Sequence, residues 1–440
     1  MENAKKTISR NLGKIIMKPS SKEKYRKNDK AFTRERKLTF SQAVIFMIRK
    51  SMKSLQNSLN EFFNEIDDNE TTITASAYSQ MRKNLSHKIF IDLNKDVIVD
   101  AIYSEDSEDS DIKLDYYKGF RVLGIDGSKI FLPNSEDIRS EFGTIKNKNQ
   151  NGTYADYSAG LGSVMYDVLN NIAIDSILAP ANSSEQKLAE DHIAVCSKND
   201  LIIGDRGYPS YRLCGTILEK KSQFIFRCSR SSFKGAQRLF ESELTENQVT
   251  LKRKDLSCKN DCDLPEEIPV RFVKVILDSG EIEVLMTSLL DSKKYPREDF
   301  KNLYWLRWGI ETYFDILKNR LNLENFTGKS SESVRQDFFS TIMVSNYESI
   351  MTADAQEVLD LKKDNKYRQK INKSVSFNII KNNVIELFHT YGNDADKLFE
   401  KMDKLFLMNP SPIRDKREFE RNTSARKALG FHKRQKKVVF

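Results

Sequence analysis

The chain has 440 residues, 39% of them hydrophobic, and a formal net charge of +9. This size and apolar content exclude a disordered chain and provide for a sizeable core in two or three domains. The positive charge favours a polyanionic partner, although two solvated basic ends would explain it equally well. No apolar run approaches the roughly 18 residues that span a bilayer, and the N-terminus lacks the apolar core of a signal peptide. We therefore expect a cytoplasmic protein without a membrane partner.

The first hundred residues are expected to be helical after a basic start. Residues 1–37 are polar and basic, which predicts an arm that is poorly ordered when free. Over 38–65, apolar residues recur close to the helical period of 3.6, which predicts one helix. Further helices are expected from Thr74 and over 90–103. The acidic run SEDSEDSD then predicts a linker over 104–118.

From about residue 119 the pattern is that of an α/β core. The segments FRVLGID and SKIFLP predict two strands joined by an Asp-Gly-Ser turn. Strands over 164–179 and a helix over 183–198, capped by Ser183 or Ser184, come next. The short apolar segment LIIGD at 201–205 predicts a buried strand. This order of strand, helix and strand indicates an α/β fold.

The second half of the chain first becomes rich in strands and then helical. Residues 222–290 contain four strand patterns, which we interpret as a β-rich insertion. A helix is expected over 297–321, and the chain stays mainly helical to about residue 407. Prolines at 410 and 412 end this pattern before a basic tail.

Five cysteines offer little chemistry. They form no disulfide framework. Cys258 and Cys262 are spaced to bind zinc, but no second pair of ligands follows at a useful spacing, so we expect no zinc site.

Two aspartates stand where acidic residues are costly. Asp126 follows Val-Leu-Gly-Ile and Asp205 follows Leu-Ile-Ile-Gly, so each is expected at the end of an apolar strand. A carboxylate there either caps a turn or binds a metal ion, and the turn is the commoner role for one aspartate alone. Ligand sites of open α/β sheets gather at strand ends, which favours the metal.

One face of the helix expected over 297–321 carries a third acid. Tyr304, Arg307, Glu311 and Lys318 fall at i, i+3, i+7 and i+14 and so share this face. An ordinary amphipathic helix with an Arg307–Glu311 ion pair is the structural alternative. The functional interpretation is an acid for a metal ion, flanked by cations and a phenol suited to phosphate oxygens.

The spacing Y-x2-R-x3-E-x6-K of these four residues resembles the signature of DDE transposases of the insertion-sequence-4 type. Asp126-Gly127-Ser128 resembles the first acidic motif of that family, and Gly204-Asp205-Arg206-Gly207-Tyr208 resembles the second. The helical start and the Arg-rich tail are also similar, so the resemblance covers about residues 35–435.

The resemblance implies an RNase H-like catalytic core over 119–345, interrupted by the β-rich insertion. It also implies a helical DNA-binding domain over 38–103 and a helical C-terminal region over 346–440 with a basic tail. Asp126, Asp205 and Glu311 would bind two Mg²⁺ ions, with Mn²⁺ as an acceptable substitute, because two ions roughly 4 Å apart stabilise both the attacking and the leaving oxygen of a phosphodiester exchange. Tyr304, Arg307 and Lys318 would bind the DNA phosphates.

The function implied is cut-and-paste transposition by a homodimer. Its partners would be double-stranded DNA, both terminal inverted repeats and target, and the protein would associate with a bacterial nucleoid. Two alternatives stay open: an inactive copy that binds transposon ends as a repressor, and a related nuclease that cuts without joining. For Trp305 and Trp308 we expect core packing. Phe224, Phe226 and Phe233 are then the candidates to trap a flipped base, if a hairpin intermediate forms.

Overall fold

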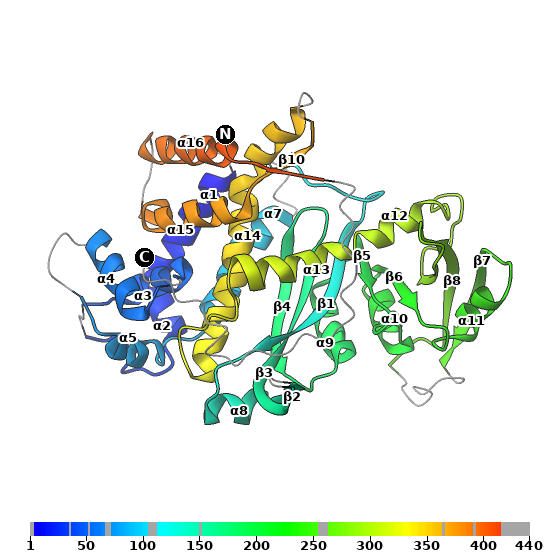
Figure 1. Cartoon of the computed structure of the whole chain (residues 1–440), viewed down its shortest axis with the longest axis horizontal. Helices are drawn as coiled ribbons and strands as arrows, with labels where there is room; N and C mark the ends of the chain where they lie inside the picture. Colours follow the sequence, from blue (N-terminus) through cyan, green and yellow to red (C-terminus); the bar gives the residue numbers. More distant parts are fainter. Residues whose placement is uncertain are drawn as a thin grey trace. The chain divides into compact units, whose positions relative to one another are not determined.

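The computed structural model of the chain divides into two compact units. It describes residues 4–34, 37–51, 53–66, 72–103, 112–148, 152–253, 263–362, 366–389 and 393–414. Unit 1 combines residues 1–113, 130–160 and 315–440, and unit 2 combines 114–129 and 161–314 (Figure 1). Among the described residues, no helix has both the length and the apolar composition needed to cross a membrane.

Unit 1 is mainly helical and is organised around the 31-residue helix α14, which contacts α3, α6, α15 and α16. Ser330 begins α14 with a capping box, in which its hydroxyl accepts from the N–H of Ser333. A buried ion pair joins α5 to α14, with Arg82 Nη2 2.9 Å from Asp337 Oδ1. The helices and helical segments of this unit are α1 (Ala4–Met17), α2 (Pro19–Tyr25), α3 (Phe40–Arg49), α4 (Leu55–Ile66), α5 (Ala75–Arg82), α6 (Lys88–Asp92), π-helical Leu93–Val99, α7 (Asp100–Tyr103), α8 (Glu136–Phe142), π-helical Ile316–Arg320, α14 (Ser331–Leu361), α15 (Lys373–His389) and α16 (Asn393–Met408).

The basic start of the chain is packed into unit 1, and the expectation of a poorly ordered arm is wrong for its described residues. Ile8, Leu12 and Ile16 follow one another at four-residue steps on α1 and are almost fully buried. Lys5 is buried as well, with its amine 2.7 Å from Asp403 and 2.9 Å from Asp354. A helical stripe of only three large apolar residues was enough to fold this segment, because α15 and α16 supply its partners.

Unit 2 contains most of a mixed β-sheet in which β4, β3, β1, β5, β6, β9, β8 and β7 lie side by side in that order. The pairs β1–β5 and β5–β6 are parallel, and β6–β9, β9–β8 and β8–β7 are antiparallel. The strands are β1 (Arg121–Phe131), β3 (Tyr154–Asp167), β4 (Ile172–Pro180), β5 (Asp200–Gly204), β6 (Gln223–Cys228), β7 (Glu246–Lys252), β8 (Glu267–Ile276) and β9 (Ile282–Thr287), and the short strands of unit 1 are β2 (Thr144–Lys148), β10 (Gln369–Lys370) and β11 (Ser411–Pro412).

The four strand patterns expected over 222–290 all form, but they extend the central sheet. Phe226 of β6 is in register with Gly204 of β5 on one side and with Met286 of β9 on the other. These four strands therefore share the apolar core of unit 2. The helices of this unit are α9 (Glu185–His192), followed by a 3₁₀ turn (Ile193–Val195), α10 (Tyr211–Glu219), α11 (Lys234–Glu241), α12 (Asp299–Trp305) and α13 (Trp308–Asp315).

Two expectations about where elements end are wrong: one expected turn does not form, and one expected helix is divided. The Asp-Gly-Ser turn does not form, because Gly127 has no positive φ and the backbone stays extended through a single strand, β1. The helix expected over 38–65 is instead two helices. Lys50 ends α3 with a φ of 22°, and the hydroxyl of Ser54 accepts from Asn57 N at the start of α4.

The helix expected over 297–321 is also interrupted. Helix α12 ends at Trp305 and α13 begins at Trp308. Between them the backbone N–H groups of Leu306, Arg307, Gly309 and Ile310 bond to carbonyls three residues earlier, which tightens the chain locally. Trp305 is 68% exposed and Trp308 37%, so the expected core packing of these tryptophans is wrong.

Some expectations fall outside the described residues. They concern Cys258 and Cys262, the acidic run at 104–111 and the basic tail from residue 415 onward.

The packing of α1 yields a first prediction. A Cβ at Gly13 would lie 2.3 Å from the carbonyl oxygen of Phe388 in α15, so Gly13→Ala must push the two helices apart. Overpacking of this kind costs about 1–3 kcal/mol, measured as a lower midpoint of thermal unfolding. Lys14→Ala, on the exposed side of the same helix, is the matched control. An unchanged midpoint for Gly13→Ala would mean that α1 is not docked on α15.

A second prediction concerns the buried ion pair between β1 and β5. Arg121 donates to both carboxylate oxygens of Asp200, at 2.7 and 3.0 Å, and Asp200 is fully buried. Arg121→Met leaves that carboxylate without its cation, which costs about 3–5 kcal/mol in the free energy of unfolding. The double variant Arg121→Met/Asp200→Leu should recover part of the loss. Equal losses in the single and double variants would contradict this account.

Candidate functional site

The three acids predicted from the sequence all lie in unit 2, on elements that the sheet holds in place. Asp126 lies within β1, two residues past Gly124, which pairs with Ile203 of β5. Asp205 follows β5 and is two residues past Ile203. The two acids are therefore level with each other on neighbouring parallel strands, whose spacing is about 4.8 Å. The expectation that Asp126 ends its strand is wrong, because β1 continues beyond its parallel partner.

Two glycines allow the helix that carries Glu311 to pack closely against β1. A Cβ at Gly124 would lie 3.3 Å from Ile310 of α13, and a Cβ at Gly309 would lie 3.2 Å from Val168. The start of α13 therefore packs directly on β1 and on the turn after β3. Glu311 lies in the first turn of this helix, where a carboxylate also interacts favourably with the helix dipole.

The charges of the three acids act on one another. Burial, helped by the negative charges of Asp205 and Glu311, raises the pKa of Asp126 to about 7, although the N–H of Gly127 and the charge of Arg307 oppose this. Asp205 accepts from the N–H of Gly207 at 2.8 Å, which fixes one carboxylate oxygen in the loop. The fold thus brings together three carboxylates that lie far apart in the sequence.

Arg307 is the cation of this site. Its guanidinium is 2.6 Å from Glu311 and is buried, with its Nε unpartnered within the described part of the chain. It lies 4.6 Å from the ring centre of Trp308 and 5.7 Å from that of Tyr304. Tyr304 itself is only 5% exposed. The ring of Tyr304 therefore packs against Arg307 within the protein and has little surface with which to contact a ligand.

Lys318 belongs to unit 1, in the π-helical segment Ile316–Arg320, and is half-buried. The tyrosine, arginine and glutamate of the expected face are thus together in unit 2, and the lysine is on the continuation of the chain.

Two polar residues near the acids were given no role from the sequence, although Tyr208 stands in the second acidic motif. A Cβ at Gly127 would lie 3.1 Å from Glu185 Oε1, so this carboxylate lies against the backbone next to Asp126. Burial raises the pKa of Glu185, and the charge of Asp205 raises it further. Tyr208 is 1% exposed and its hydroxyl has no hydrogen-bond partner in the described part of the chain, which costs about 1–3 kcal/mol. The position of Glu185 directly after the capping Ser184 gave no signal, because acids are common there for helix stability alone.

The three phenylalanines expected to trap a flipped base differ in how exposed they are. Phe224 and Phe226 are fully buried and stack on each other with ring centres 5.3 Å apart, so neither can receive a base. Phe233 precedes α11, is partly exposed and lies 6.2 Å from the ring of Phe272. Trp308, which is 37% exposed, lies against Arg307 beside the acids.

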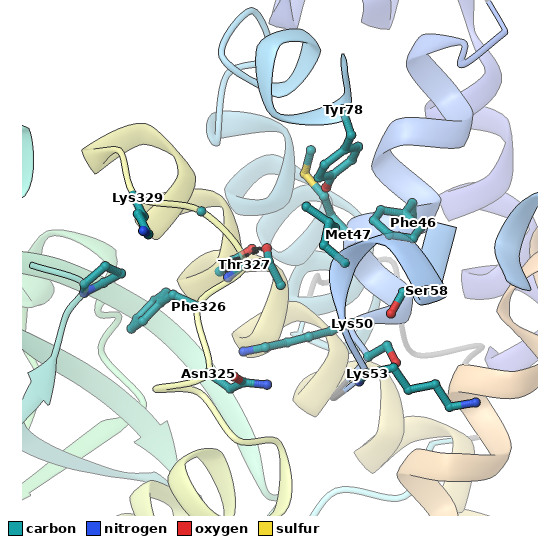
Figure 2. A pocket seen from close by; sticks show the side chains of 15 residues that line it. Phe46, Met47, Lys50, Lys53, Ser58, Tyr78, Asn325, Phe326, Thr327 and Lys329 are labelled. Carbon is teal, nitrogen blue, oxygen red and sulfur yellow. Dashed lines mark hydrogen bonds between the residues drawn. The ribbon is translucent and has the colours of Figure 1, made fainter. Parts of the chain in front are cut away.

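Figure 2 shows a cavity of about 130 Å³ in unit 1 that contains none of the predicted site residues. Lys50 extends across it towards Asn325 and Phe326. Burial lowers the pKa of Lys50 to about 8, the charge of Asp337 opposes this, and that of Arg82 adds to it. Its amine donates to the carbonyl of Leu323 at 3.4 Å, so this lysine has a structural partner.

A carboxylate site of this composition suits a hard divalent cation, since Mg²⁺ prefers carboxylate oxygens and keeps several of its waters. The unpartnered hydroxyl of Tyr208 beside the acids agrees with such an ion. The site is nevertheless open: among the described residues, no three acidic, histidine or cysteine side chains are grouped closely enough to hold a metal ion. Glu311 can reach an ion only by giving up or sharing its contact with Arg307.

Comparisons with known proteins point to one family. The family model described as "Transposase DDE domain" matches residues 119–347, which include all three acids. The transposase InsG for insertion sequence element IS4 of Escherichia coli is 23% identical over 247 residues, 54% of this chain and 54% of that protein. A putative transposase, y4zB, of Sinorhizobium fredii is 28% identical over 145 residues, 32% of this chain and 39% of that protein.

A structural comparison matched the cryo-EM structure of the piggyBac transposase synaptic complex with hairpin DNA, at a TM-score of 0.45 and 11% identity, covering 94% of this chain and 88% of that one. The chain spans about half the length of the first of the two relatives and less of the second. The family model covers more than half of the chain. The chain therefore belongs to the family of proteins with a transposase DDE domain.

Proposed function

We propose that the chain is a DNA transposase, which cleaves DNA at transposon ends and joins the freed strand to target DNA. The observation that carries this proposal is the convergence of Asp126, Asp205 and Glu311 beside one buried arginine. An RNase H-like core is part of the proposal, and the parallel strands β1 and β5 with level acids support it.

Divalent ions, Mg²⁺ or Mn²⁺, would be held by Asp126, Asp205 and Glu311, and two such ions are proposed from the family resemblance. When bound, they would activate a water or 3′-hydroxyl and stabilise the charge that develops on the phosphate. The chain's own contribution is to position these carboxylates. Asp126 and Asp205 are fixed by strand register, and Glu311 is fixed by the packing of α13 on glycine.

Phosphate binding is assigned to Arg307 and Lys318, with Tyr304 as a positioning residue. The guanidinium of Arg307 is held between two aromatic rings, which leaves its direction well defined. Its bond to Glu311 places a donor for phosphate next to a ligand for the metal. Tyr304 is too buried for direct contact with DNA, and its ring supports Arg307 instead.

The substrates would be terminal inverted repeats and target DNA, both double-stranded, and the active assembly would be a homodimer. The net charge of +9 supports a polyanionic substrate. The retained carboxylates and the adjoining arginine support catalysis over a role as an inactive repressor.

The first test of this proposal replaces each acid by its amide. Asp126→Asn, Asp205→Asn and Glu311→Gln should lower metal-dependent cleavage of DNA bearing the element's own ends by at least about a hundredfold, since even outer-shell partners of a metal site cost up to this much. Binding to the ends should persist in Glu311→Gln, because the change removes a negative charge and releases Arg307. Cleavage products would be resolved on sequencing gels with Mg²⁺ and with EDTA.

Glu298→Gln, an exposed acid just before α12, is the control and should cut normally. Tight end binding by the unaltered chain without any cleavage in Mg²⁺ or Mn²⁺ would support the repressor instead. Cutting without strand-transfer products would support a nuclease. Equal loss of binding and cleavage in Glu311→Gln would remove Glu311 from the metal site.

A second test concerns Lys318. Lys318→Ala should weaken end binding and lower the slope of log affinity against log salt by about one, because one phosphate contact releases about one counterion. Lys293→Ala, an exposed lysine of unit 2, is the matched control and should leave the slope unchanged. The slope would be measured by fluorescence anisotropy of labelled end DNA, and an unaltered slope in Lys318→Ala would exclude the contact.

A further inference from the structure

A fourth carboxylate, that of Glu185, faces the strand that carries Asp126. Glu185 is the first residue of α9, and a Cβ placed on Gly127 would lie 3.1 Å from both its Cγ and its Oε1. Gly127 has no positive φ, so its backbone does not need glycine. What this position needs is room, and Glu185 occupies that room next to Asp126.

Both ends of α9 are fixed, which makes this placement a property of the fold. At its start, Ser184 accepts from the N–H of Lys187, and the amide of Gln186 donates to the carbonyl of Gly207 at 2.8 Å. This second bond ties the first turn of α9 to the loop that carries Asp205. At its end, the buried His192 is 2.7 Å from Asp175. Glu185 is therefore held at the two acidic motifs and does not sample the surface freely.

One negative and one positive side chain act on the charge of Glu185. The charge of Asp205 acts on it unfavourably, and Lys129 is the cation that acts on it favourably. Arg307, the other cation near these acids, is bonded to Glu311. Glu185 therefore stands near another acid of the site, Asp205, as well as near Lys129.

Tyr208 supplies an independent sign of a ligand. Its side chain is 1% exposed, and within the described residues its hydroxyl has no hydrogen-bond partner. The charges of Asp126, Glu185 and Asp205 act on this phenol, as does the opposite charge of Arg307, so the hydroxyl lies within electrostatic reach of the three carboxylates. A buried hydroxyl is ordinarily satisfied by protein or by bound water. Water carried by a cation on these acids would satisfy it.

We propose that Glu185 is a fourth carboxylate of the divalent metal site, acting with Asp126 and Asp205, and that Tyr208 donates to a water of the bound ion. This inference rests on the proposed function. The acids are too widely spread to form a closed ligand group by themselves. Glu185 therefore acts partly through water, which suits an ion such as Mg²⁺ that keeps several of its waters.

The experiment is a titration of the full chain, without DNA, with Tb³⁺ as the luminescent probe. Excitation of tyrosine sensitises Tb³⁺ bound close by, and Tyr208 is placed to do this. Competition with Mg²⁺ then gives the affinity for the physiological ion. Glu185→Gln should weaken binding about tenfold or more, as loss of a partner of a metal site does. Asp191→Asn, an exposed acid of the same helix, should bind as the unaltered chain does.

Asp126→Asn separates this inference from the proposed function. Weaker binding in Asp126→Asn with unchanged binding in Glu185→Gln would overturn the role of Glu185 and leave the three-acid site intact. Unchanged binding in both variants would overturn the metal site itself. Thermal unfolding without metal shows whether Glu185→Gln is folded.

If Glu185→Gln does not fold, Tyr208→Phe tests the same site. Removing an unpartnered buried hydroxyl should leave the metal-free unfolding temperature equal or higher. The rise in unfolding temperature on adding Mn²⁺ should be smaller than in the unaltered chain. A full Mn²⁺-dependent rise in Tyr208→Phe would contradict the proposed contact with the ion.

Discussion

The parallel pairing of β1 with β5 is the constraint on which the site depends. The buried pair between Arg121 and Asp200 lies at one end of this pairing, and the two residues are in register. Five residues further along each strand come Asp126 and Asp205. A slip of one residue would turn one acid to the opposite face of the sheet, so the ion pair that secures the register also secures the site.

The third acid depends on a different constraint, the close approach of helix to strand. Gly124 and Gly309 lack side chains, so Ile310 of α13 packs against β1 and Val168 packs against α13, which sets Glu311 near Asp126. The helix is interrupted just before this point, and the interruption exposes Trp305 while burying Arg307. Arg307 therefore contacts Glu311, the proposed metal ligand, and is also the proposed contact for a DNA phosphate.

Local sequence patterns predicted most helices and strands. The predictions failed where contacts with residues far away in the sequence determine the structure. The strand after Asp200 and the helix after Ser184 are confirmed, because an apolar run and a capping hydroxyl act within a few residues. The turn at Gly127 was wrong, since the residue is glycine to admit Glu185 and not to turn the chain. The basic first helix was wrongly expected to be disordered, because its buried stripe finds its partner in α15, far along the chain.

The sequence by itself determined which chemistry is available: two aspartates after apolar runs and a glutamate in the spacing Y-x2-R-x3-E-x6-K identify the acids and the family. This is possible because motif spacing along one strand or helix fixes local geometry. Only the tertiary structure decided which other groups share the site, namely Glu185 and the unpartnered Tyr208, and which aromatics are exposed. These features depend on how separate elements pack. Packing brings together residues that are far apart in the sequence, and their spacing does not predict that they are in contact.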